Sequence, residues 1–277
     1  MRWELEGELY ATLYNGERIP RIGLGTWRVG GESSPDHTRD AEMVNLIYAA
    51  IDMGYRLIDT AEMYAGGHTE SLIGQAIGGF NREELFITTK VWHTQLHYRD
   101  VIQSLDQSLH RLRTDYVDLF LIHWPNTSIP LEETFEAMNE LVSQGKTRHL
   151  GVSNFDLPLL KRAYALAKPA LANIQVRYSL TQRTPVQNGV LAYCQENDIV
   201  LTAYSPVKGG LLKRPLVHEL AQKYGVTPAQ IALSWLVKQP KVNTIPMSTN
   251  PQHLKDNLGA IDLKLEEEDV ELLGKMV

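Results

Sequence analysis

Short apolar runs alternate along the chain with longer stretches in which apolar residues recur every three or four positions. The short runs cover 21–25, 56–59, 85–90, 117–123, 147–153, 173–176, 199–204 and 242–245. The helical stretches between them begin near Thr38, Glu70, Arg99, Leu131, Leu157, Pro185, Leu216 and Gln252. This alternation is typical of βαβ units with a parallel sheet. About eight strands and eight helices favour a closed (β/α)8 TIM barrel over an open sheet.

The two ends of the chain predict additions to this α/β barrel. Residues 9–19 carry Asn15-Gly16 between apolar stretches, which predicts a β-hairpin with a type I′ turn that plugs the bottom of the barrel. Helical period over 227–238 and 266–273 predicts extra helices near the C-terminus. Because no Pro/Gly/Ser-rich linker marks a boundary, residues 1–277 are expected to form one domain.

Composition narrows the class of function. The 277 residues are 43% hydrophobic and 22% charged, as in ordinary globular proteins. The net charge of -6 gives no basic footprint, so nucleic acid is not an expected partner. No stretch approaches the roughly 18 consecutive apolar residues of a membrane span, and acidic residues interrupt Met1 to Glu6, where a secretory signal would need an apolar run. We therefore expect a cytoplasmic protein, monomeric or at most weakly dimeric, whose single Cys194 excludes an intramolecular disulfide.

Four polar residues stand where predicted strands end, which is the end of a parallel barrel that carries active sites. Asp59, Lys90 and His123 each close an apolar run, and Tyr64 follows Asp59 by five residues. Singly, each has a structural explanation as a salt bridge or a core residue. Together they suit carbonyl reduction, because hydride addition leaves an alkoxide that a tyrosine beside an ammonium can protonate. Asp59 would keep Lys90 protonated, and His123 would orient the substrate oxygen.

The chain resembles the aldo-keto reductase superfamily over nearly its whole length, in particular its prokaryotic members similar to diketogluconate and aldehyde reductases. The resemblance rests on the segments GYRLIDTAEMY (54–64), ITTKVW (87–92), DYVDLFLIHWP (115–125) and GVSNF (151–155). It implies NAD(P)H-dependent reduction of aldehydes and ketones to alcohols. Tyr64 would be the general acid, with its pKa lowered by Lys90. Asp59 would pair with Lys90, and His123 would position the carbonyl.

The resemblance also implies where cofactor and substrate bind. Ser153, Asn154 and Gln175 would hydrogen-bond the nicotinamide carboxamide, and Tyr204 would stack on the ring. The complete set expected around the dinucleotide is Gly25, Thr26, Trp27, Asp59, Ser153, Asn154, Gln175, Tyr204, Ser205, Val207, Gly209, Ile245, Met247, Ser248, His253, Asp256 and Asn257. The expected substrate pocket is aromatic and consists of Trp27, Tyr64, Trp92, His123 and Trp124.

The adenosine end of this pattern departs from the family. Met247 and His253 stand where the family usually carries a lysine and an arginine that hold the 2′-phosphate of NADPH. Loss of two charge-assisted hydrogen bonds predicts a weakened preference for NADPH over NADH. Lys255 or a protonated His253 is a possible replacement for the missing charge.

Other functions are compatible with parts of the pattern. A redox-sensing regulatory subunit that binds nicotinamide nucleotide with little turnover is disfavoured because all four catalytic residues are present. A Schiff-base lyase that uses Lys90 as nucleophile is disfavoured because a carboxylate-paired lysine stays protonated. The nine histidines show no metal-ligand spacing such as HExxH, so no metal is expected. His68 in particular is expected to be an exposed loop residue.

Overall fold

Eight parallel strands form the centre of the molecule in the computed structural model, which describes residues 9–276. The strands lie side by side in the order of the chain: β3 (Leu24–Gly25), β4 (Leu57–Asp59), β5 (Phe86–Val91), β6 (Val117–Ile122), β7 (Thr147–Ser153), β8 (Leu171–Arg177), β9 (Val200–Tyr204) and β10 (Val242–Thr244). A parallel bridge between Ile22 and Thr244 joins the first strand to the last. Gly23 N donates to Thr244 O at 2.8 Å, and Thr244 N donates to Arg21 O at 2.8 Å. The sheet therefore closes into the expected TIM barrel.

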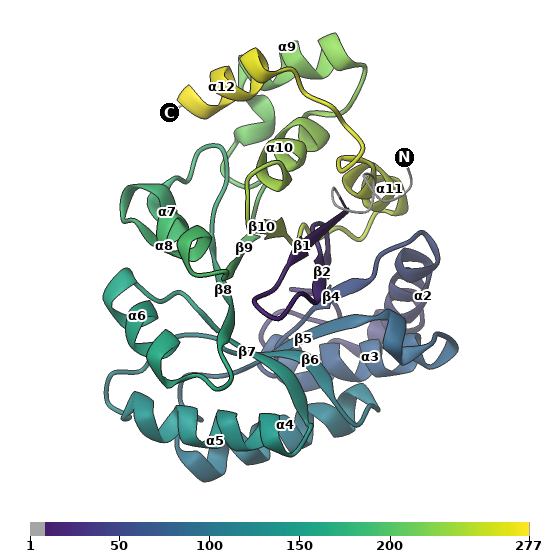
Figure 1. Ribbon diagram of the computed structural model, residues 1–277. Helices are drawn as coiled ribbons and strands as arrows, with labels where there is room; N and C mark the ends of the chain where they lie inside the picture. Colours follow the sequence, from purple (N-terminus) through teal and green to yellow (C-terminus); the bar gives the residue numbers. More distant parts are fainter. Residues whose placement is uncertain (1–8, 277) are drawn as a thin grey trace.

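Helices surround the strands on the outside of the barrel (Figure 1). They are α2 (Asp40–Asp52), α3 (His68–Ala76), α4 (Tyr98–Leu112), α5 (Leu131–Ser143), α6 (Leu157–Leu166), α7 (Thr184–Gln187), α8 (Val190–Glu196), α9 (Pro215–Tyr224), α10 (Pro228–Val237), α11 (Pro251–Gly259) and α12 (Glu267–Lys275). The extra helices expected near the C-terminus are α10 and α12. The stretch predicted as one helix from Pro185 is two short helices, because Gly189 between them adopts a left-handed φ of 79°.

Short 3-10 helices complete the connections between strands and helices. They are η1 (His37–Arg39), η2 (Tyr64–Gly67), η3 (Ile77–Gly79), η4 (Arg82–Glu84) and η5 (Leu211–Lys213). Two of them, η1 and η2, lie in the loops that follow β3 and β4. These loops leave the carboxyl ends of their strands, where the candidate residues were expected.

The barrel has apolar layers on both sides of its wall. All residues of β5 and β6 are buried, as expected for parallel strands covered on both faces. One apolar cluster fills the space between the sheet and the helices. A second lies within the barrel, where Leu57, Leu119 and Val200 pack with Ala11 and Ile19 of the N-terminal segment.

The N-terminal segment is the predicted hairpin, and it closes the bottom of the barrel. Strand β1 (Tyr10–Thr12) pairs with β2 (Arg18–Pro20) in antiparallel register, and its buried side chains enter the inner cluster. The predicted type I′ turn is wrong. Leu13 N donates a hydrogen bond of 2.8 Å to Glu17 O, so the loop consists of the three residues between them. Of these three, only Gly16 has a positive φ. A type I′ turn needs positive φ at two central residues, whereas one left-handed glycine is typical of a three-residue loop.

Within residues 9–276, no helix is long and apolar enough to cross a membrane. Met1 to Glu6, on which the expectation about a secretory signal depends, lie outside the described residues.

Candidate active site

A buried ion pair joins two adjacent strands at the carboxyl end of the barrel. Lys90 Nζ donates to Asp59 Oδ1 at 2.6 Å and to the carbonyl oxygen of Thr60 at 2.7 Å. Lys90 is completely buried and Asp59 nearly so. An ammonium removed from water needs such partners to remain charged. Two of the four predicted residues are therefore in direct contact.

The Tyr64 side chain lies against this ion pair. Tyr64 begins η2, in the loop that follows β4, and Lys90 Nζ is 5.2 Å from the centre of its ring. The next two residues, Ala65 and Gly66, both have left-handed φ values of 48° and 62°. These backbone conformations turn the chain sharply after the tyrosine, so its buried side chain returns to the end of the barrel.

Aromatic rings enclose the phenol. The Trp27 ring lies 4.9 Å from the Tyr64 ring, and the His123 ring lies 5.7 Å from it, measured between ring centroids. Trp92 makes an edge contact with His123 at 5.2 Å. The structure thus brings together four of the five residues expected in the substrate pocket. The fifth, Trp124, is 44% exposed and makes no such ring contact with the other described residues.

His123 is held as a neutral side chain. Burial and the positive charge of Lys90 lower the pKa of His123 to about 2. Its Nδ1 is buried and has no hydrogen-bond partner among the described residues. Its backbone is fixed, because His123 N donates to Val91 O at 3.0 Å. A neutral imidazole in this position can hydrogen-bond a carbonyl oxygen but does not carry charge.

Two opposing influences set the pKa of Tyr64. Burial raises the pKa of Tyr64 above its ordinary value, and the opposing influence of Lys90 is weaker than burial. Lys90 therefore lowers the pKa of Tyr64, as expected, but burial raises it by more, so the pKa lies above its ordinary value. Burial lowers the pKa of Lys90, but Asp59 and Tyr64 raise it by more, so the pKa of Lys90 lies above its ordinary value. At neutral pH the site combines a protonated phenol with an ammonium.

The residues expected around the nicotinamide carboxamide form one hydrogen-bonded group at the ends of β7, β8 and β9. Ser153 Oγ and Asn154 N both donate to Gln175 O, at 2.8 and 3.0 Å. Asn154 Nδ2 donates to His123 O at 3.0 Å, and Tyr204 OH donates to Asn154 Oδ1 at 2.9 Å. These side chains therefore hold one another in place beside His123.

The loop after β3 meets the loop after β10. Gly25 N donates to Pro246 O at 3.1 Å, and a Cβ on Gly25 would lie 2.6 Å from Ile245 O, so only glycine fits there. Thr26 Oγ1 donates to Asp59 O at 2.8 Å. The side chain of Met247 lies 3.6 Å from the same built Cβ position. Of the expected cofactor set, Thr26 thus contacts Asp59, and Ile245 and Met247 lie against Gly25, its neighbour in the chain.

The residues expected at the far end of the dinucleotide follow two neighbouring strands, in the loops after them and in α11. Ser205, Val207 and Gly209 follow β9, while Ser248, His253, Asp256 and Asn257 follow β10, its neighbour in the sheet. Ser248 Oγ is 3.4 Å from His253 Nδ1, and His253 is exposed. Gln252 Nε2 donates to Asp256 Oδ1 at 2.8 Å, and Asn257 is buried.

Sequence reasoning missed Glu62, which holds the backbone of Trp92. Glu62 Oε1 accepts a hydrogen bond of 2.6 Å from the backbone N of Trp92, and burial raises the pKa of Glu62. Both residues line a cavity of about 470 Å³ that also contacts Met63 and does not include Tyr64, Lys90 or His123. The only signal for Glu62 was its place inside the segment 54–64.

Known proteins resemble this chain in both sequence and structure. Residues 21–277 match the model of the Aldo/keto reductase family. Methylglyoxal reductase YeaE of Escherichia coli (strain K12) is 35% identical over 264 residues, which cover 93% of this chain and 90% of that protein. The crystal structure of the thermostable aldo-keto reductase Tm1743 has a TM-score of 0.94 and 49% identity, covering 97% of this chain and 100% of that one. An aldo-keto reductase from Klebsiella pneumoniae in complex with NADPH has a TM-score of 0.87 and 34% identity, covering 96% and 94%. This chain belongs to the aldo/keto reductase family of NAD(P)H-dependent oxidoreductases.

Proposed function

We propose that this protein reduces the carbonyl group of small aldehydes or ketones to an alcohol, with Tyr64 as the proton donor. The observation that carries the proposal is the buried Lys90 ammonium, which is held by Asp59 and lies 5.2 Å from the Tyr64 ring. Burial keeps the phenol protonated at neutral pH, so a proton is available. The ammonium stabilises the phenolate that remains when that proton is given up.

The chemistry divides between the cofactor and the side chains. NAD(P)H supplies the hydride that adds to the carbonyl carbon. Tyr64 gives its proton to the oxygen, which is becoming an alkoxide, and the phenolate that results rests against Lys90. His123 is neutral because burial lowers its pKa to about 2, so it donates or accepts a hydrogen bond and positions the carbonyl oxygen.

We infer that the nicotinamide binds against Ser153, Asn154, Gln175 and Tyr204. Their hydroxyl and amide groups can pair with a carboxamide, and the phenol ring of Tyr204 offers a flat apolar face. The group lies beside His123, because Asn154 donates to the carbonyl of that residue. Hydride delivery next to His123 and Tyr64 is consistent with this placement.

Small 2-oxoaldehydes are the first substrates to test. YeaE of Escherichia coli carries the name methylglyoxal reductase, and its alignment covers 93% of this chain. The rings of Trp27, Trp92 and His123 around Tyr64 suit small or flat carbonyl compounds.

The experiment measures oxidation of NADPH and NADH by the purified protein with a panel of aldehydes, 2-oxoaldehydes and ketoses. Tyr64→Phe removes only the phenol oxygen, and we expect at least about a hundredfold loss of kcat. Tyr48→Phe is the matched control, because Tyr48 lies exposed on α2. Full activity of the Tyr64→Phe variant would overturn the proposal. Tight cofactor binding without turnover of any substrate would instead favour a redox-sensing regulatory subunit.

A further inference from the structure

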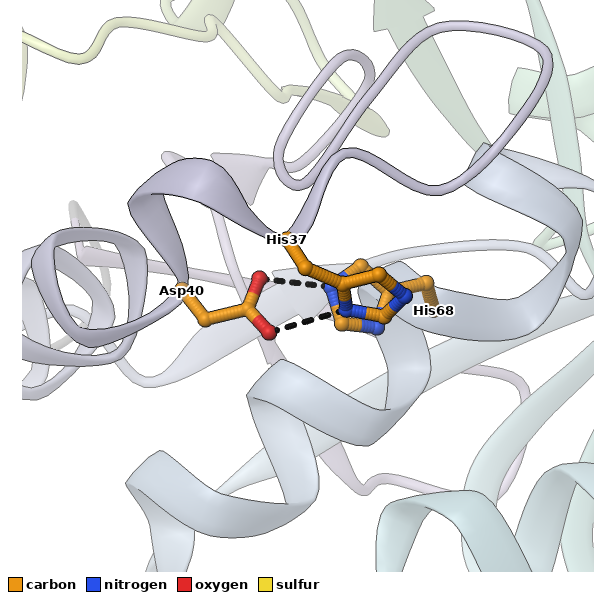
Figure 2. A group of neighbouring side chains, drawn as sticks. All are labelled: His37, Asp40 and His68. Carbon is orange, nitrogen blue, oxygen red and sulfur yellow. Dashed lines mark hydrogen bonds and ion pairs between the residues drawn. The ribbon is translucent and has the colours of Figure 1, made fainter.

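Two histidines from different segments of the chain meet at one carboxylate (Figure 2). His37 lies in η1, Asp40 begins α2, and His68 begins α3. Asp40 Oδ2 is 3.1 Å from His37 Nδ1, and Asp40 Oδ1 is 2.7 Å from His68 Nε2. The two imidazole rings lie close together, with centroids 4.2 Å apart. Each residue offers one atom that could coordinate a metal ion, and these three atoms lie within 4.8 Å of one another.

His68 is not the exposed loop residue that the sequence predicted. Its side chain is only 9% exposed, because the loop after β3 folds over it. Gly30 has a left-handed φ of 76°, and a Cβ there would lie 2.9 Å from the His68 ring. A glycine is therefore needed where this loop passes the imidazole.

The loops that carry the cluster are fixed by other hydrogen bonds. Thr69 Oγ1, next to His68, donates to Val29 O at 2.6 Å. Asp36 accepts a hydrogen bond from Thr38 N at 3.0 Å and so caps η1. Both histidines are thus presented from backbone that the protein itself holds in place, which lowers the entropy cost of gathering ligands around an ion.

The set of donors suits a transition-metal ion. Imidazole nitrogen and carboxylate oxygen are ligands of Zn²⁺, and three protein ligands leave a coordination position for water. The His37 side chain is 68% exposed, so solvent has access to the cluster. Hydrogen bonds from His68 and His37 hold the pKa of Asp40 below its ordinary value, which leaves the carboxylate ionised at neutral pH. No other group of three such side chains lies this close within residues 9–276.

We propose that His37, Asp40 and His68 bind a divalent transition-metal ion of the Zn²⁺ type. In the bound state each imidazole coordinates the ion through a ring nitrogen that carries no proton. The hydrogen that a neutral imidazole shares with Asp40 moves to its other ring nitrogen, and a proton displaced from an imidazolium passes to solvent. The ion would join the loop that carries Trp27 to the start of α3, four residues after Tyr64. It takes no part in hydride or proton transfer and acts as a clamp between the two loops that flank the phenol.

The test measures Zn²⁺ binding to the full chain without an affinity tag, by calorimetry in a buffer that does not bind metal. His37→Gln and Asp40→Asn each remove one ligand at a partly or largely exposed position, so the fold is expected to persist. We expect each to weaken the Kd at least about tenfold, as does His68→Gln. His97→Gln is the matched control, because His97 pairs with Glu133 alone and should leave the Kd unchanged.

A second measurement separates a defined site from loose binding. Co²⁺ in place of Zn²⁺ is expected to give visible absorption bands in the wild-type protein and none in the His37→Gln variant. Zn²⁺ is expected to raise the Tm of the wild-type protein and not that of this variant, because an ion that binds only the folded state stabilises it. Equal Zn²⁺ affinity in the wild-type protein and the ligand variants, or the absence of a Tm shift, would overturn the proposal. Both measurements are independent of catalysis, so failure of the proposed reductase activity would leave them unaffected.

Discussion

Gln175 Nε2 donates a hydrogen bond of 2.7 Å to Asp59 Oδ2 across the barrel. Asp59 ends β4, and Gln175 lies on β8, four strands away in an eight-stranded closed sheet. The second oxygen of the same carboxylate accepts from Lys90 at 2.6 Å. The residues proposed to donate the proton and the residues proposed to bind the nicotinamide are thus joined through the buried side chain of Asp59.

Replacement of Gln175 by methionine is expected to destabilise the protein. The change keeps a side chain of similar size but leaves Asp59 Oδ2 buried without its donor, which costs about 1–3 kcal/mol. Urea unfolding of Gln175→Met and of the exposed control Gln187→Met measures the difference. A Gln175→Met protein as stable as the control would show that this hydrogen bond contributes nothing.

The ion pair at the centre of the site is expected to be strongly coupled. Lys90→Met alone leaves a buried carboxylate without its cation, and removal of one partner of such a pair typically costs about 3–5 kcal/mol. The double variant Asp59→Asn/Lys90→Met removes both charges and still offers an acceptor to Gln175, so we expect it to be more stable than Lys90→Met. Denaturant unfolding of the double-mutant cycle gives the coupling energy. Strict additivity of the two single changes would contradict a direct interaction.

His123 is expected to make stability depend on pH below about 6.5. Burial lowers the pKa of His123 to about 2 in the folded protein, whereas the unfolded chain takes up a proton near pH 6.5. The stabilising contribution is therefore complete above pH 6.5 and decreases as the pH falls. Between pH 7 and pH 5 the wild-type protein should lose about 2 kcal/mol more stability than His123→Asn. Parallel stability curves for the two proteins would show that His123 is protonated in the folded state.

The preference for NADPH or NADH is expected to change on substitution of the partly buried Met247 and the exposed His253. Met247→Lys and His253→Arg restore cations at the place proposed for the 2′-phosphate of NADPH. Each charge-assisted hydrogen bond is worth about 1.5 kcal/mol at the lower end of its usual range, which suits positions that solvent reaches. We therefore expect the ratio of kcat/KM for NADPH over NADH to rise about tenfold per substitution, and less at high salt. An unchanged ratio in the double variant would place the adenosine phosphate elsewhere.

The pattern of apolar residues predicted those features of the structure that depend on local geometry. The strand ends at Asp59, Lys90 and His123 could be predicted, because strands in a closed parallel barrel have their carboxyl ends on one rim. The turn at Asn15-Gly16 could not, because the type of turn depends on how the two strands pair across it. Glu62 was missed because its partner is a backbone N–H 30 positions away in the chain.

The amino-acid sequence by itself determined the alternation of strands and helices, and with it the barrel and the residues on its rim, because the period of apolar positions is a local property. The tertiary structure decided which distant groups touch and how much water each retains. Gln175 reaches Asp59 only across a closed barrel, and His68 reaches Asp40 only because a loop folds over it. The raised pKa of Tyr64 has the same origin, since burial depends on every element packed around the phenol and no spacing of residues records it.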